Sequence, residues 1–244
     1  MFTGNLEALL AQVDPALQQE LRKELLEHRR MDAIETVKCR YDPKRYMAYS
    51  GARKANAELL GLTPVGRDSA FASLVAVHPN FDDMVIKVVE WNDAGAWYLR
   101  ACHDGTISGP HAPVVYAVHR MGEQAFIYME RLIDVNDTPE DRKEYVDEAN
   151  GYVRGYSWAN CPEPTMDAWR EQFQQWNKHP TGEFSMFCTD FHRGNCMFRA
   201  DGTLVFIDPV HGSLDTESQR LEKRQVRERY WAERQRREEQ QHHI

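Results

Sequence analysis

The strongest constraint on the fold is the position of the strand-like segments, which fall almost entirely between residues 69 and 132. Four runs rich in β-branched and aromatic residues follow one another there, at 69–77, 84–89, 113–120 and 124–132. Turn-forming residues separate the first two runs, and Met-Gly-Glu at 121–123 joins the last two in a pattern typical of a hairpin. We therefore predict a mostly antiparallel sheet with one helix inserted at 92–105, capped by Asn92 or Asp93.

Helical patterns lie on both sides of this strand-rich region. Residues 4–30 and 50–61 precede it, and Gly61 is expected to end the second of these helices. Residues 137–160, with Pro139 at the first helical position, and residues 163–179 follow it. Aromatic and apolar residues in the last of these segments recur three to four positions apart, which favours a helix that packs into the core. Two short strands around Asp201-Gly202 complete the order. Along the chain, a sheet with one helix is followed by further helices and then by a hairpin. This order predicts an α+β chain with two lobes that meet at a cleft.

Bulk properties place the chain among ordinary globular proteins. It has 244 residues, 42% hydrophobic and 28% charged, so a sizeable core can form. The net charge of −8 argues against a general nucleic-acid binder. Five scattered cysteines do not suggest a disulfide framework and fit a reducing compartment. Because no apolar run approaches the ~20 residues of a membrane span and the start lacks a signal-peptide pattern, we expect a cytosolic protein.

Candidate catalytic residues gather in the stretch TDFHRGNCMFRADGTLVFIDP, residues 189–209. Asp190 and Asn195 have the D-x-x-x-x-N spacing of a kinase catalytic loop, and Asp208 follows the next strand, where a second magnesium ligand would lie. Upstream, Lys87 in MVIKVV matches the strand lysine that contacts ATP phosphates, and residues 66–77 occupy the place of a loop over the phosphates. Magnesium needs few protein oxygens because it keeps several waters.

Each of these signals has a simpler explanation when taken alone. Asp190 and Asn195 could cap a turn, and Asp208 could merely end a strand before a proline. Their order, spacing and predicted context agree with one another, however, and this conjunction indicates a site for phosphoryl transfer.

The same residues resemble a known family. Segments 78–102, 189–210 and, more weakly, 230–240 are similar to the early serine/threonine protein kinases of T-seven-like podophages, and the resemblance extends from about Gly66 to Val210. It implies a two-lobed protein-kinase-like fold, ATP and Mg²⁺ as cofactors, and action in the cytoplasm of a bacterial host. Substrates would be host proteins, including the transcription, RNA-processing or defence machinery, and the kinase itself.

The resemblance also implies a role for each matched residue. Asp190 would be the catalytic carboxylate with His192 beside it, Lys87 would bind the phosphates, and Asn195 and Asp208 would hold Mg²⁺. The nucleotide would further contact a phosphate-covering loop and a hinge, whose residues are Gly66, Ser69, Phe71 and Ser73 in the loop and Met129, Glu130 and Arg131 in the hinge.

Departures from the family pattern are equally specific. The covering loop has the single glycine Gly66, Thr189 replaces the arginine before the catalytic aspartate, and Pro209 follows Asp208. His192 stands two residues after Asp190, where a protein kinase has lysine, and makes the loop closer to that of small-molecule kinases of the aminoglycoside type. We expect it to be neutral and to fix Asp190 by hydrogen bonding.

No glutamate is clearly placed to pair with Lys87. Glu90 is too near on the same strand and Asp93 falls near the helix cap, so either a remote acid such as Glu58 substitutes or Lys87 is positioned differently. Only 36 residues follow Asp208, which leaves little chain for a peptide-docking lobe.

The predicted organisation has four parts. They are an N-terminal helical extension (1–61), a sheet-containing N-lobe (62–132), a reduced helical C-lobe with the catalytic loop (133–216) and a charged C-terminal helix or tail (217–244). Because the tail mixes both signs of charge, it is expected to be a solvated or dimer-packing helix, and an RNA or an acidic protein partner is the alternative.

Three other interpretations remain open at this point. Cys188, His192 and Cys196 are spaced four apart, but a zinc site would need a fourth ligand that the sequence does not supply. The acceptor could be a small molecule. Alternatively, the chain could be a kinase-like effector that binds and inhibits a host enzyme without catalysis, as the missing glycines would allow.

Overall fold

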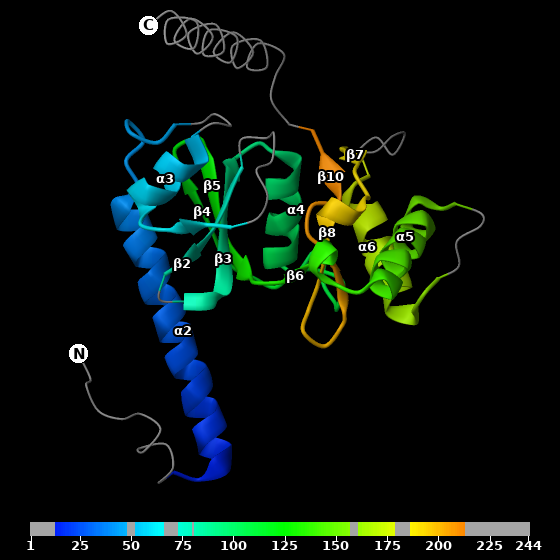
Figure 1. Cartoon of the computed structure of the whole chain (residues 1–244), viewed down its shortest axis with the longest axis horizontal. Helices are drawn as coiled ribbons and strands as arrows, with labels where there is room; N and C mark the ends of the chain where they lie inside the picture. The colour runs from blue at the N-terminus through cyan, green and yellow to red at the C-terminus, as the bar shows by residue number, and fades with distance from the viewer. Residues whose placement is uncertain are drawn as a thin grey trace, which may run out of the picture.

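A computed structural model describes residues 13–47, 52–65, 73–79, 81–156, 161–178 and 186–212. It is an α+β structure in which a five-stranded sheet with α2, α3 and α4 lies on one side and α5, α6 and two small sheets lie on the other (Figure 1). This arrangement is compatible with the predicted pair of lobes. The charged tail from residue 217 lies outside the described residues. Within the described ranges, no helix is long and apolar enough to span a bilayer.

The large sheet is antiparallel throughout and has the order β1-β2-β3-β5-β4. Its strands are β1 (Thr63–Pro64), β2 (Leu74–His78), β3 (Phe81–Glu90), β4 (Val115–Met121) and β5 (Gln124–Glu130). Gly122 turns the chain between β4 and β5 with φ of 62°, which confirms the predicted hairpin at Met-Gly-Glu. The four predicted strand-like runs therefore correspond to the four longer strands of one sheet.

Alternation along β5 gives the sheet two buried faces. Phe126 and Tyr128 point to one face and join a core with α2 and α3, while Ala125 and Ile127 point to the other and join a core with α4, α5 and α6. Successive side chains of a strand point to opposite faces, so a strand apolar at every position must be covered on both sides. The central strand thus belongs to both cores.

Helices α2 (Pro15–Arg40) and α3 (Arg53–Leu60) cover the first face of the sheet. The helix predicted to end at residue 30 continues for ten more residues, because Ile34 and Val37 lie on its inner face and are buried against the sheet. Gly61 ends α3 in the left-handed conformation, as its position predicted. Within the segment predicted as an N-terminal extension, 1–61, the part of α2 from Leu26 onward and α3 share a core with the sheet.

The second half contains α4 (Ala94–His103), α5 (Glu140–Arg154), α6 (Pro164–Trp176) and short strands. The short strands and turns are β6 (Ile133–Asp134), η2 (Val135–Asp137), β7 (Cys188–Thr189), η3 (Arg193–Asn195), β8 (Cys196–Phe198), β9 (Leu204–Phe206) and β10 (Val210–His211). Asp93 caps α4, and Gly202 turns the β8–β9 hairpin with φ of 93°; both agree with the predictions. Helix α5 begins one residue after Pro139, which was predicted to be its first residue.

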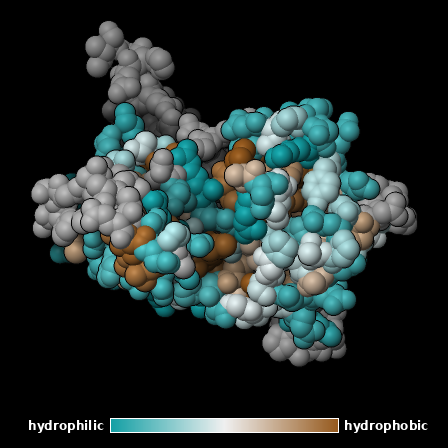
Figure 2. All heavy atoms as spheres, turned by 90° about the horizontal axis from the view of Figure 1, so that it is seen from below, coloured by the Kyte–Doolittle hydropathy of each residue, from teal (hydrophilic) through white to brown (hydrophobic). Residues whose placement is uncertain are grey.

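Aromatic stacking joins α6 to the β8–β9 hairpin. Trp169 stacks on Phe206 with 4.2 Å between ring centroids and on Phe173 at 5.2 Å. Met166, Trp169 and Phe173 are all buried, so the apolar stripe of this helix is core, as predicted. On the face seen in Figure 2, hydrophilic residues dominate, and several of the few hydrophobic patches lie around the hollow in the middle.

One ion pair fastens the hairpin to the end of β5. Arg199 binds both carboxylate oxygens of Glu130, with its Nε 2.9 Å from Oε2 and its Nη2 2.6 Å from Oε1. It also donates to the carbonyls of Pro110 and Ala112. Both side chains are mostly buried, at 20% and 14% exposure, so the pair is protected from solvent screening.

Replacing Arg199 with methionine should therefore destabilise the fold. We expect the free energy of unfolding to fall by about 2 kcal/mol, because the Glu130 carboxylate would remain largely buried without its cation. Urea denaturation would measure the change. Lys38→Ala, which removes a more exposed ion pair with Glu35, should cost less than about 0.5 kcal/mol. Equal losses in the two variants would contradict a special role for Arg199.

Candidate active site

The predicted phosphate-binding lysine meets the predicted metal ligand across the two halves of the structure. Lys87 lies in the middle of β3, paired with Val75 and Ile127 in the neighbouring strands. Its Nζ is 2.8 Å from Asp208 Oδ2. The lysine side chain is 11% exposed and the aspartate 33%, so the ion pair is partly shielded from water. Residues 121 positions apart in sequence thus form the centre of the candidate site.

Asp208 belongs to the same hydrogen-bonded unit as the predicted catalytic loop. The amide of Ile207 donates to the carbonyl of Asn195 at 2.9 Å, and the amide of Asp190 donates to the carbonyl of Pro209 at 2.8 Å. Strands β7 and β10 pair next to these bonds. The backbone therefore holds Asp190, Asn195 and Asp208 side by side.

Within the loop, one side chain binds the Asp190 carboxylate and a second lies beside it. Asn195 Nδ2 donates to the Asp190 carbonyl at 2.8 Å and to Oδ2 at 3.0 Å. His192 Nε2 lies 3.6 Å from the same Oδ2. Both contacts fall on one carboxylate oxygen, which leaves Oδ1 available for another partner such as a substrate hydroxyl.

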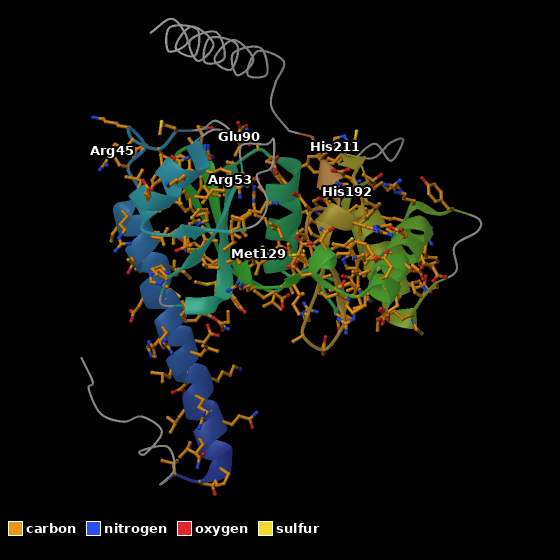
Figure 3. The ribbon with its side chains drawn as sticks, in the orientation of Figure 1. Arg45, Arg53, Glu90, Met129, His192 and His211 are labelled. Carbon is orange, nitrogen blue, oxygen red and sulfur yellow. The ribbon has the colours of Figure 1, made fainter. Side chains whose placement is uncertain are left out.

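The tautomer of His192 follows from the loop backbone. The amide of Gly194 donates to His192 Nδ1 at 3.0 Å, so this nitrogen must be the acceptor and the single proton of a neutral ring must be on Nε2, toward Asp190. A β-carbon at position 194 would lie only 2.9 Å from His192 Cε1, so glycine at this position leaves room for the imidazole ring. His192 therefore makes a hydrogen bond within the catalytic loop, as expected, and its charge stays a prediction. In Figure 3, His192 lies on the half that carries α5 and α6.

The N-terminus of α4 closes the site from the side of the sheet. Asp93 caps the helix by accepting from the Ala96 amide at 3.2 Å. Burial raises the pKa of Asp93, and the neighbouring charges of Lys87 and Asp208 act on it in opposite directions, Lys87 lowering it and Asp208 raising it. Lys87 is therefore flanked by two acids. Glu58, the remote candidate, is exposed on α3.

Gly95 allows Asp208 to approach this helix. A β-carbon at position 95 would lie far inside the contact distance from Asp208 Oδ1 and 3.1 Å from Asp208 Cγ. Tyr98 then fixes α4 to the strand before Asp208, because its hydroxyl donates to the Phe206 carbonyl at 2.8 Å in the buried interior. Neither Asp93 nor Gly95 was among the predicted site residues. The sequence does carry a signal for them, because a helix that begins with a capping aspartate and small residues follows soon after Lys87.

The predicted hinge is built into the sheet. The amide of Glu130 donates to the Val114 carbonyl at 3.0 Å, and the amide of Arg131 donates to the Asp83 carbonyl at 2.9 Å. An adenine contact here would therefore have to use the carbonyl groups of the segment or other backbone groups nearby. The Glu130 side chain is occupied by Arg199. Met129 lies near the boundary between the two halves (Figure 3).

The predicted phosphate-covering loop falls mostly outside the described residues. Gly66, Ser69 and Phe71 are among the residues that the structure does not describe. Ser73 directly precedes β2 and is partly buried. The contribution of this segment to nucleotide binding stays a prediction.

The oxygen donors at the centre fit a magnesium ion held jointly with phosphates. Asn195 uses its Nδ2 to bind Asp190 and its backbone carbonyl to bind Ile207, the residue before Asp208, so the side-chain oxygen of Asn195 remains as a potential ligand. One amide oxygen and one carboxylate suffice for Mg²⁺, which takes further ligands from phosphate and water. Among the described residues, no three His, Cys, Asp or Glu side chains are grouped so that they could hold a metal ion by themselves.

The zinc interpretation gains no support from the cysteines. Cys196 is buried, and burial raises the pKa of its thiol to about 12, which disfavours the thiolate that binds zinc. Its thiol donates to Asn150 Oδ1 at 3.5 Å, whereas Cys188 is exposed.

Comparison with models of protein families and with curated proteins finds no match for this chain.

Proposed function

We propose that this chain is an ATP- and Mg²⁺-dependent phosphotransferase of the protein-kinase-like superfamily, acting on serine and threonine hydroxyls of bacterial host proteins. The observation that carries the proposal is the Lys87–Asp208 contact of 2.8 Å, formed beside a loop in which Asn195 binds Asp190 and His192 lies beside it. A phosphate-binding cation, two metal-binding oxygens and a carboxylate for the hydroxyl are the groups that phosphoryl transfer requires. The protein acceptor and the host cytoplasm rest on the resemblance of the segments around these residues.

Each residue has a defined part in the proposed reaction. Lys87 would exchange Asp208 for the α- and β-phosphates, and Asn195 and Asp208 would hold the magnesium ion that neutralises phosphate charge. Asp190 would accept the proton of the attacking hydroxyl as the oxygen bonds to the γ-phosphorus and the bond to the bridging oxygen of ADP breaks. His192, neutral and donating from Nε2, would keep the Asp190 carboxylate in position.

Labelling of host proteins tests this proposal directly. Bacterial lysate is heat-treated to inactivate its own kinases and is then incubated with the purified protein, γ-labelled ATP and Mg²⁺. We expect acid-stable label on serine and threonine, and we expect chelation of magnesium to abolish it. ADP release with added small hydroxyl compounds but no labelled protein would favour a small-molecule acceptor. No magnesium-dependent ADP release under any condition would contradict the proposal and favour the non-catalytic effector.

A further inference from the structure

We infer that the phosphoryl acceptor binds in a groove between α5 and the catalytic loop, and that Arg154 selects acceptor peptides with an anionic group near the hydroxyl. The inference rests on the proposed function and adds its substrate class. The open groove has a volume of about 510 Å³ and lies between α5, Tyr156 and loop residues 191–194. His192 forms part of its wall and contacts the Asp190 carboxylate, so the groove opens beside the proposed catalytic group.

The two arginines that line this groove differ in their partners. Arg193 is neutralised by Asp147, because its Nε and Nη2 bind the two carboxylate oxygens at 2.9 and 2.6 Å. Arg154 donates instead to two uncharged groups, the Phe191 carbonyl and, at 3.2 Å, the Tyr156 hydroxyl. Among the described residues no carboxylate forms an ion pair with Arg154. One end of the groove therefore carries a positive charge for which the described residues supply no carboxylate partner.

Arg154 is also held in a fixed place relative to Asp190. Its bond to the carbonyl of Phe191, the residue directly after Asp190, attaches the guanidinium to the loop that carries Asp190. An arginine has five N–H donors in a planar fork, so two bonds leave donors for a carboxylate or a phosphate. An anionic group bound there would belong to a residue close to the acceptor serine or threonine.

The acidic residues of α5 do not reverse this preference. Asp147 is matched by Arg193, and Glu140 is matched by Lys143 at 3.0 Å. Glu144 also acts electrostatically on Arg193. A basic acceptor residue would have to compete with the cations that already bind Asp147 and Glu140, whereas an anionic one would meet Arg154.

A peptide series tests the inference. The peptides are alanine- and glycine-based, of about ten residues, with one serine and with Asp, phosphothreonine, Ala or Arg at each nearby position in turn. We expect wild type to show kcat/KM about tenfold higher for the best anionic peptide than for its alanine counterpart, as one charge-assisted contact would give. The Asp and phosphothreonine arms separate a carboxylate-selective site from one that requires prior phosphorylation.

Variants at Arg154 assign the preference to this side chain. Arg154→Gln should lower kcat/KM for the anionic peptide about tenfold and remove the ratio over alanine, while Arg154→Lys, which keeps the charge but loses the fork, should retain part of the ratio. Lys143→Gln makes the same charge change on the same helix outside the groove and should leave the ratio intact. Melting curves would confirm that all variants are folded.

The outcomes separate this inference from the proposed function. Phosphorylation of the peptides without an anionic preference, a preference for arginine, or a preference that survives in Arg154→Gln would overturn the inference and leave the phosphotransferase in place. If neither peptides nor heat-treated lysate accept phosphate from wild type, the proposed function itself fails.

Discussion

Asp190→Asn should slow phosphoryl transfer about 1000-fold while leaving the fold intact. Loss of a general base costs on the order of 100- to 10,000-fold, and this carboxylate is the one that Asn195 holds within the loop. Asparagine has the same shape, and its carbonyl oxygen can still accept from Asn195 Nδ2, which contacts Asp190 Oδ2 at 3.0 Å. Rates of peptide or protein labelling would measure the loss, and thermal melting would show that the variant is folded.

Asp201→Asn is the matched control for this experiment. Asp201 lies in the exposed β8–β9 turn, where its carboxylate accepts from the Thr203 amide at 2.9 Å. Its replacement removes the same charge from the same segment of chain, and we expect the rate to stay within about twofold because the residue lies outside the site. A full rate in Asp190→Asn, or an equal loss in Asp201→Asn, would be incompatible with the assigned role of Asp190.

Gly95→Ala should be the most harmful conservative change near the site. Alanine normally stabilises a helix relative to glycine by about 0.5–1 kcal/mol. Here its β-carbon would collide with the Asp208 carboxylate, so either Asp208 or the first turn of α4 must move. We expect a rate loss of about 100-fold from misplacement of Asp208, and a fall of about 2 kcal/mol in the free energy of unfolding from overpacking.

A second substitution can separate the collision from any other effect of alanine. Asp208→Ala removes the carboxylate that the new β-carbon would meet most closely and leaves the milder contact with Asp93 Oδ1 at 3.1 Å. In that background, Gly95→Ala should lower the free energy of unfolding by clearly less than it does with Asp208 present, and the activity should remain absent. If Gly95→Ala destabilises equally with and without Asp208, the contact between these two residues is not the cause.

Local signals in the sequence were enough to predict most of the fold. Alternating and β-branched runs gave the strands, Met-Gly-Glu at 121–123 and Asp201-Gly202 gave the hairpins, and Asp93 and Gly61 gave helix ends. These features depend on residues adjacent in the chain, whose conformational preferences are strong. The end of α2 was placed ten residues too early because only packing against the sheet distinguishes its last turns.

The candidate site was predictable in its parts and not in its assembly. The spacing of Asp190 and Asn195 and the strand context of Lys87 identified the residues, and the structure brings Lys87 to Asp208 and orders the loop around Asp190. The neighbours of Lys87 could not be predicted, because Asp93 comes near it only through the placement of α4 against β4, β5 and β10. Long-range contacts such as those of Arg199 and Arg154 have no signature in local sequence.

The burial of both faces of strand β5 affects how cooperatively the protein unfolds. Consecutive residues of this strand insert into the two different cores. Unfolding of either half would therefore expose one face of β5 to water and would also destabilise the core on its opposite face. The two halves should therefore lose structure in one concerted transition and not as separable units. In hydrogen exchange, the amides of β5 should be among the last to exchange, and α2 and α3 could not be deleted without melting the sheet that carries Lys87.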